Sequence, residues 1–229
     1  MMNAKRLTLF AGHYGSGKTN IALNYARALH ETGHTVTIAD LDIVNPYFRT
    51  KDSEEALRKE GIELICSEYA NSNLDVPAMP KEIYGLIEGR DRMGVLDIGG
   101  DDRGALALGR YVPEILKEND YDMLFVVSFT RPLTRTAQEA VEVMGEILEA
   151  CKLPFTGIVN NTNLGPDTTA EDVLRSVEKA KELSELTGLP VRMTCAEKSL
   201  CPQLKGIENL FPLSIQRLYY MMNSEVPNG

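Results

Sequence analysis

Gly12-His13-Tyr14-Gly15-Ser16-Gly17-Lys18-Thr19 matches the phosphate-binding pattern G-x-x-x-x-G-K-[ST]. The apolar run of residues 7–11 precedes this stretch, and apolar residues at helical spacing follow it over 21–29. A glycine-rich turn exposes backbone N–H groups, and the next helix adds its positive N-terminal end, so fixed dipoles hold a polyphosphate. The sequence therefore predicts a strand, a phosphate loop and a helix in that order.

The residue types in this loop predict their roles. We expect Lys18 to reach the β- and γ-phosphates of a nucleotide and the Thr19 hydroxyl to bind Mg²⁺. A glycine turn that ends in Lys-Thr by chance is the alternative, but the flanking strand and helix disfavour it. The predicted nucleotide-contacting residues of this segment are Gly12, His13, Tyr14, Gly15, Ser16, Gly17, Lys18, Thr19 and Asn20.

Length and charge narrow the class of protein. The 229 residues contain no low-complexity linker or internal repeat, which predicts a single nucleotide-binding domain over residues 1–229. The formal net charge of -9 argues against extensive binding to nucleic acid or to an anionic membrane. The first residues lead into a strand without a signal-peptide pattern, and no apolar run is long enough to span a membrane. We therefore expect a cytoplasmic protein without a stable membrane anchor.

The four cysteines are Cys66, Cys151, Cys195 and Cys201, and no two of them form a C-x-x-C pair. In a reducing compartment, scattered cysteines of this kind are more often small buried apolar residues than metal ligands. The Cys195/Cys201 pair is the one that leaves metal binding open.

Strand-like and helix-like segments alternate along the chain, which predicts an α/β fold with a mostly parallel, doubly wound sheet and helices on both faces. Ligands of such a sheet bind at the carboxyl ends of its strands. Capping boxes are expected at residues 52–55 and at Thr168 with Glu171. The expected strands are 7–11, 35–39, 62–66, 93–97, 123–127, 155–159 and 191–194, and the expected helices are 21–29, 52–61, 80–87, 105–116, 137–148, 168–188 and 212–222.

Acidic residues follow two of the expected strands. Asp40 and Asp42 come after the second strand, and Asp97 ends the fourth within the D-x-x-G form that Gly100 completes. A strand-end Asp of this kind supports Mg²⁺ in phosphate-loop proteins, and the Gly100 N–H is placed to sense the γ-phosphate. The alternatives are a turn or a helix cap for Asp97 and ordinary strand-end acids for Asp40 and Asp42.

These motifs resemble the MinD/ParA family, part of the CobQ/CobB/MinD/ParA group of nucleotide-binding domains, and the resemblance runs over most of the chain. It implies an ATP- and Mg²⁺-dependent ATPase in which Lys18 and Asp42 are catalytic, Asp42 polarising the attacking water. It also implies that Thr19, Asp42 and Asp97 form the metal site. The family places an adenine-contacting Asn where this chain has Asn160, although a turn-forming Asn also fits the position.

The phosphate loop departs from the family in one position. The family's loop begins Gly-Lys-Gly-Gly, and the early lysine reaches the nucleotide of a partner subunit, whereas this chain has His13 there. A His in such a loop is more often tolerated by the backbone than catalytic. A weak nucleotide-dependent homodimer would therefore need another cation, for which Arg103 and Arg131 are the candidates, although each could make an ordinary surface ion pair.

Three functions fit these observations. The first is a slow ATPase that acts as a conformational switch for an unknown protein partner, with residues 45–49 and 67–79 as moving or docking loops. The second is an ATP-dependent kinase or ligase resembling dethiobiotin synthetase, which would bind a small-molecule acceptor. The third is a nucleotide-dependent metallochaperone. We expect ATP over GTP, because residues 160–163 lack the lysine and the carboxylate of the guanine-reading pattern Asn-Lys-x-Asp.

Overall fold

A computed structural model describes residues 4–41, 51–66, 81–100 and 102–214, without the side chains of residues 51–53, 102, 103 and 107. Its strands are β1 (Leu7–Ala11), β2 (Val36–Leu41), β3 (Glu63–Cys66), β4 (Met93–Ile98), β5 (Tyr121–Val127), β6 (Gly157–Asn160), β7 (Val191–Glu197) and β8 (Leu210–Leu213). Its α-helices are α1 (Lys18–Glu31), α2 (Lys51–Lys59), α3 (Lys81–Glu88), α4 (Asp102–Gly109), α5 (Val112–Glu118), α6 (Ala137–Cys151) and α7 (Ala170–Thr187).

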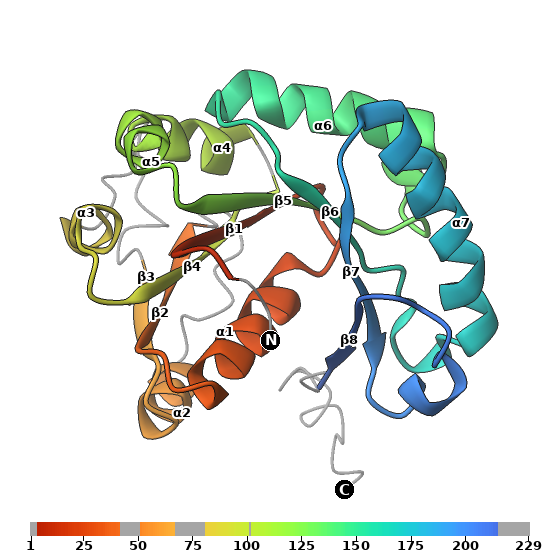
Figure 1. The fold of residues 1–229 in the computed structure, drawn as a ribbon, viewed down its shortest axis with the longest axis horizontal. Helices are drawn as coiled ribbons and strands as arrows, with labels where there is room; N and C mark the ends of the chain where they lie inside the picture. Colours follow the sequence, from red (N-terminus) through yellow and green to blue (C-terminus); the bar gives the residue numbers. More distant parts are fainter. Residues whose placement is uncertain (1–3, 42–50, 67–80, 101, 215–229) are drawn as a thin grey trace, which may run out of the picture.

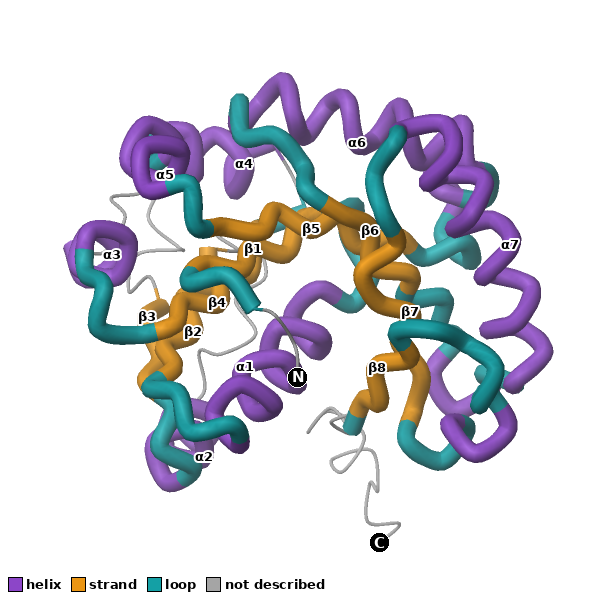
Figure 2. The backbone as a smooth tube through the Cα atoms, in the orientation of Figure 1, coloured by secondary structure: helices purple, strands orange, loops and turns teal. Residues whose placement is uncertain are grey.

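The strands form one eight-stranded sheet in the order β3-β2-β4-β1-β5-β6-β7-β8, with every neighbouring pair parallel. Figure 2 shows this sheet as the orange layer that curves through the molecule. β1 lies between β4 and β5, so the segment that follows β1 emerges in the middle of the carboxyl edge. The chain thus places its phosphate loop where an open parallel sheet binds ligands.

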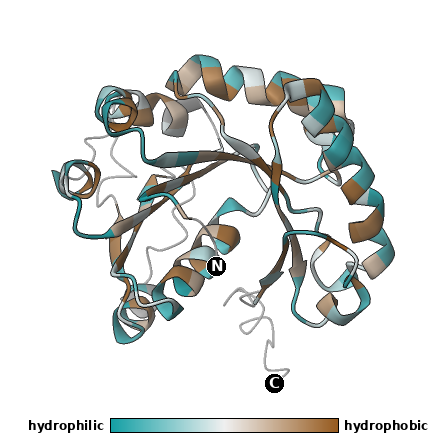
Figure 3. Cartoon of the chain, viewed as in Figure 1, coloured by the Kyte–Doolittle hydropathy of each residue, from teal (hydrophilic) through white to brown (hydrophobic). Residues whose placement is uncertain are grey.

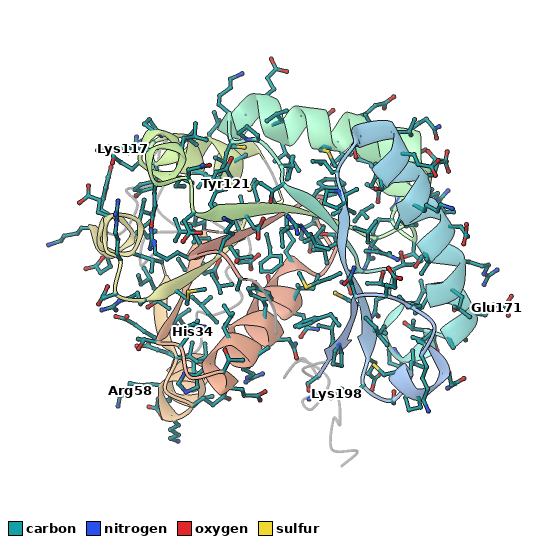
Figure 4. All side chains as sticks on the ribbon, in the orientation of Figure 1. His34, Arg58, Lys117, Tyr121, Glu171 and Lys198 are labelled. Atoms are coloured by element: carbon teal, nitrogen blue, oxygen red, sulfur yellow. The ribbon has the colours of Figure 1, made fainter. Side chains whose placement is uncertain are left out.

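Helices cover both faces of the sheet, as the sequence predicts. α1 and α2 pack on one face, and α3, α4, α5, α6 and α7 pack on the other (Figure 1). Every residue of β1 and β2 is buried, which is why apolar residues predominate at both alternating sets of positions in these strands. Figure 3 shows the strands mainly in the hydrophobic colour, and Figure 4 shows Arg58, Lys117 and Glu171 on the outer surfaces of their helices.

The helix expected over residues 105–116 is wrong as a single element. The chain forms α4 up to Gly109 and starts α5 at Val112, with Tyr111 as its N-cap residue and Pro113 in its first turn. Proline fits the first turn of a helix because the N–H that it lacks has no partner there. Pro113 therefore fits the first turn of a second helix that starts at Val112.

The capping box expected at Thr168 and Glu171 lies one residue further along. Thr169 accepts a bond from the Asp172 N–H, and the Asp172 carboxylate accepts one from the Thr169 N–H. Thr168 instead donates its hydroxyl to the Gly165 carbonyl oxygen at 2.8 Å. A second capping box, which is not among those expected from the sequence, begins α6 at Thr136 with Glu139.

The helix expected from residue 212 is wrong at its start, because residues 210–213 form β8 at the edge of the sheet. Pro212 is tolerated in β8 because one side of an edge strand has no neighbouring strand. The N–H that proline lacks is not needed for a hydrogen bond on that side. The rest of that expected helix, from residue 215, lies outside the described residues. In the part of the chain that is described, no helix is both long and apolar enough to cross a bilayer.

Candidate nucleotide-binding site

The phosphate loop runs from the end of β1 to the first residue of α1, and its glycines occupy positions that exclude a side chain. Gly15 and Gly17 have φ values of 76° and 87°, in the left-handed region that favours glycine. A Cβ atom at Gly12 would lie 2.2 Å from the carbonyl oxygen of Val126 on β5. The G-x-x-x-x-G pattern is therefore required here by both the backbone and the neighbouring strand.

Each carbonyl oxygen from residue 13 to residue 17 accepts a hydrogen bond, and most of the donors are side chains. The donors are Ser16 N (3.2 Å) and Lys18 Nζ (3.3 Å) to His13, His13 Nδ1 (3.0 Å) to Tyr14, Arg131 Nε (2.9 Å) to Gly15, Asn161 Nδ2 (2.7 Å) to Ser16, and Ile21 N (3.1 Å) to Gly17. These bonds hold the backbone of the loop in place. The loop leads into the N-terminus of α1, whose first N–H groups have no partner within the helix and are suited to bind an anion.

The side chains at the start of α1 meet those at the end of β4. Thr19 donates its hydroxyl to Asp97 Oδ2 at 2.5 Å, and Lys18 is buried, with 6 % of its surface exposed. The register of β2 with β4 places Asp40 directly beside Asp97, and both carboxylates are buried. One cation, one hydroxyl and two carboxylates thus gather at the carboxyl edge beside the loop. Asp40 was noted in the sequence as a strand-end acid but was not assigned to the site.

These donors fit a magnesium ion by their chemistry. Hydroxyl and carboxylate oxygens are hard ligands, and Mg²⁺ is commonly held by one or two of them together with phosphate and water oxygens. Carboxylates buried side by side also favour a cation between them. The Thr19 and Asp97 parts of the predicted metal set are therefore together, whereas Asp42 lies outside the described residues.

Gly100 lies against the phosphate loop from the β4 side. A Cβ atom at this position would stand 2.7 Å from Tyr14 N and 3.0 Å from Lys18 Nζ. The backbone of Gly100 thus approaches the loop as closely as only glycine allows. A contact of its N–H with a phosphate stays a prediction.

Asn160, the last residue of β6, and Asn161, which follows it, have different surroundings. Asn160 is fully buried, donates from Nδ2 to Ser176 Oγ at 2.7 Å and accepts at Oδ1 from the Thr162 hydroxyl at 3.0 Å. Asn161, which no motif in the sequence marks as a site residue, is the one of the two that contacts the phosphate loop. The adenine contact of Asn160 stays a prediction, and these internal bonds do not favour it.

The other residues predicted to bind nucleotide or phosphate differ in burial and in their hydrogen bonds. His13 is half-buried and bonds within the loop, Tyr14 is exposed at 63 %, and Asn20 accepts a 2.8 Å bond from Asn24 at its carbonyl oxygen. Arg131 contacts the loop of its own chain. The side chain of Arg103 and the loops of residues 45–49 and 67–79 lie outside what the structure describes.

The cysteines give no support to a metal-carrying role. Cys195 is buried, and burial raises the pKa of its thiol, so that the thiolate needed to bind a soft metal is disfavoured. Burial also raises the pKa of Cys151. Within the described residues, no group of three or more His, Cys, Asp and Glu side chains is arranged to hold a metal ion.

Comparisons with known proteins agree with this geometry. The family model described as the CobQ/CobB/MinD/ParA nucleotide binding domain matches residues 7–192. No curated protein matches the chain. Similar solved structures are FtsY from Mycoplasma mycoides (18 % identity, TM-score 0.57, covering 85 % of this chain and 60 % of that one) and chloroplast FtsY from Physcomitrella patens (15 %, 0.57, 82 % and 57 %).

A third similar structure is the signal recognition particle receptor FtsY from Elizabethkingia anophelis in complex with GDP (14 % identity, TM-score 0.54, covering 85 % of this chain and 58 % of that one). This chain thus spans about three-fifths of the length of these three FtsY chains. At these identities the likeness shows the fold alone, which is that of a phosphate-loop NTPase domain.

Proposed function

The chain belongs to the CobQ/CobB/MinD/ParA nucleotide-binding domain family, and we propose that it is a Mg²⁺-dependent ATP-binding protein that hydrolyses ATP slowly. Membership supplies the coarse function, which is nucleotide binding by a phosphate-loop NTPase domain. The identity of the nucleotide, the metal and the hydrolysis are the parts proposed here.

The observation that carries the proposal is the contact of the Thr19 hydroxyl with Asp97 beside the buried Lys18. Thr19 and Asp97 would hold Mg²⁺, and the ammonium group of Lys18, which here donates to the His13 carbonyl oxygen, would bind the phosphates. When bound, Mg²⁺ supplies neutralisation of the charge that develops on the phosphates. The loop amides orient the polyphosphate through fixed dipoles that need no rearrangement.

Asp42 is proposed to polarise the attacking water, on the strength of its place after β2 and of the family resemblance. Replacing it should leave ATP binding largely intact and suppress hydrolysis, whereas Lys18→Ala should abolish tight binding. Hydrolysis by Asp42→Ala at the parental rate would show that another residue polarises the water.

ATP is proposed over GTP because the stretch that begins at the end of β6 lacks the guanine-reading pattern Asn-Lys-x-Asp. Residues 160–164 are Asn, Asn, Thr, Asn and Leu, without a carboxylate to accept from the ring N–H and amino group of guanine. The FtsY structure with GDP makes GTP the competing nucleotide to test. Titration calorimetry with both nucleotides and Mg²⁺ decides between them, and equal or tighter GTP binding would refute the choice of ATP.

The role of a conformational switch for a protein partner is proposed from the family resemblance of the loop and strand-end acids. The alternative is an ATP-dependent enzyme with a small-molecule acceptor. ATP turnover measured alone and then with a panel of metabolites separates the two, because an acceptor would raise turnover and be consumed. Recovery of proteins retained by the ATP-bound form would then identify a partner.

A further inference from the structure

Arg131 lies on a turn after β5 that backbone and side-chain bonds hold in place. The Arg131 N–H donates to the Ser128 carbonyl at 3.1 Å, and the Arg131 carbonyl accepts from the Thr134 N–H at 3.1 Å. The Thr134 hydroxyl adds a 2.7 Å bond to the Ser128 carbonyl, and Pro132 limits the backbone further. The position of Arg131 is therefore fixed before any ligand binds.

The side chain of Arg131 is directed to the tip of the phosphate loop. Its Nε donates to the Gly15 carbonyl at 2.9 Å, and a Cβ atom on Gly15 would lie 3.3 Å from Nε and 3.4 Å from Cζ. The residue is exposed, and no other hydrogen bond or ion pair of its guanidinium occurs within the described ranges. The outer N–H groups and the planar face of the guanidinium are thus available to a ligand. The sequence-based expectation that Arg131 reaches the phosphates of a partner subunit stays a prediction.

The sheet order gives a bound nucleotide its direction. β4 lies on one side of β1. It carries Asp97, which holds the metal in the proposed function, and leads to Gly100, whose N–H is predicted to contact the terminal phosphate. β5 and β6 lie on the other side, and they lead to Arg131 and Asn161. If the terminal phosphate lies toward β4, the nucleoside extends toward the loops after β5 and β6. Arg131 is therefore on the nucleoside side of the loop.

We propose that Arg131 is a ligand-contacting residue that packs the face of its guanidinium against the sugar and base of the bound nucleotide. A guanidinium is planar and weakly hydrated, and it stacks on aromatic rings such as a purine. The Gly15 bond and the rigid turn hold it in that position at a small entropic cost. This inference rests on the proposed function and assigns a residue for nucleoside affinity within it.

The test compares ATP with inorganic tripolyphosphate, which has the phosphates without the nucleoside, each titrated with Mg²⁺ into the full chain. Arg131→Ala should weaken ATP binding by about tenfold more than it weakens tripolyphosphate binding, because only ATP loses the stacked contact. Arg135→Ala, an exposed arginine four positions further on, is the matched control and should change neither affinity. Tripolyphosphate binding and the melting temperature report whether each variant keeps its fold.

Two results would overturn the inference while leaving the proposed function intact. Equal loss of both probes in Arg131→Ala would show that the arginine acts through its charge or through the Gly15 carbonyl, and an unchanged ATP affinity would show that it makes no contact. A parental protein that binds tripolyphosphate but not ATP would instead refute the proposed function, and the inference with it.

Discussion

Asn161→Ala tests the site most directly. It removes a side chain that holds the phosphate loop by a hydrogen bond, and Asn161 is not itself a predicted ligand of the nucleotide. The variant loses the 2.7 Å bond from Asn161 Nδ2 to the Ser16 carbonyl, and both residues are buried. A lost buried bond that leaves a carbonyl without its donor destabilises by about 1–3 kcal/mol. The bond fixes the loop, so we expect much of this free energy to appear in binding, as a rise in the Kd for ATP of about tenfold or more.

Asn160→Ala is the matched control, since Asn160 is the neighbouring asparagine but bonds inside the fold to Ser176 and Thr162. We expect it to lower the melting temperature by about 5 °C or more and to leave the Kd for ATP close to the parental value. Titration calorimetry with ATP and Mg²⁺ gives the Kd, and differential scanning calorimetry gives the melting temperature. A larger loss of affinity in Asn160→Ala than in Asn161→Ala would refute this reasoning and support the adenine contact predicted for Asn160.

Gly100→Ala should weaken ATP binding about tenfold or more, because its Cβ would stand 2.7 Å from a backbone nitrogen of the phosphate loop. Gly85→Ala, with open space around its Cβ, should bind ATP with the parental affinity. Equal affinities of the two variants in calorimetry would contradict this prediction. Asp97→Ala should raise the Mg²⁺ concentration needed for ATP binding, since Thr19 loses its acceptor, and an unchanged Mg²⁺ titration would return Asp97 to a structural role. Burial, together with the charge of Tyr84, raises the pKa of Tyr111 from 10 to about 12, so the stability that it contributes is complete below pH 10 and is lost progressively as the pH rises toward 12. The melting temperature should fall less steeply between pH 8 and pH 12 in Tyr111→Phe than in the parent. An identical dependence of melting temperature on pH would show that the raised pKa of Tyr111 does not contribute to stability.

The sequence predicted those parts of the site that a short sequence pattern marks. The strand, loop and helix around Gly12–Thr19 follow from glycines and from apolar spacing, which are read within about twenty residues. Asp97 was found because a buried strand ends in it, and the 2.5 Å contact with Thr19 confirms that the two lie together. A parallel sheet brings strand ends to one edge whatever the loop lengths, so this convergence needed no knowledge of the strand order.

The two side chains that hold the phosphate loop by hydrogen bonds, Arg131 and Asn161, could not be predicted in the same way. Arg131 and Asn161 are 116 and 145 positions away from the loop residues that they contact, and their approach depends on β5 lying beside β1 and on β6 lying next to β5. An Asn or Arg after a strand is common in turns and surface ion pairs, so neither residue type marks such a role by itself. β8 was missed for a different reason, because a four-residue edge strand that contains Pro212 lacks the usual strand pattern.

The last prediction concerns the amino ends of the strands, opposite the phosphate loop. A substitution there should lower the stability of the fold without changing nucleotide affinity. Arg6 is buried before β1, forms a bidentate ion pair with Glu118 at the end of α5, and donates to the carbonyls of Leu86 (2.9 Å) and Ile87 (2.7 Å) in the last turn of α3. Removing one member of such a pair leaves the other charge buried without its partner. Arg6→Met should therefore destabilise the fold by about 3–5 kcal/mol.

Replacing both members, as Arg6→Met with Glu118→Leu, should recover much of this stability, because no buried charge is left behind and apolar side chains fill the space. Both variants should keep the parental Kd for ATP at a temperature where they are folded, since Arg6 precedes β1 and the phosphate loop follows it. Urea unfolding gives the free energies and calorimetry gives the affinities. A double variant as unstable as Arg6→Met would show that the carbonyl bonds of Arg6, and not its ion pair, dominate its contribution. A parallel loss of ATP affinity would show that the two edges of the sheet are coupled through β1.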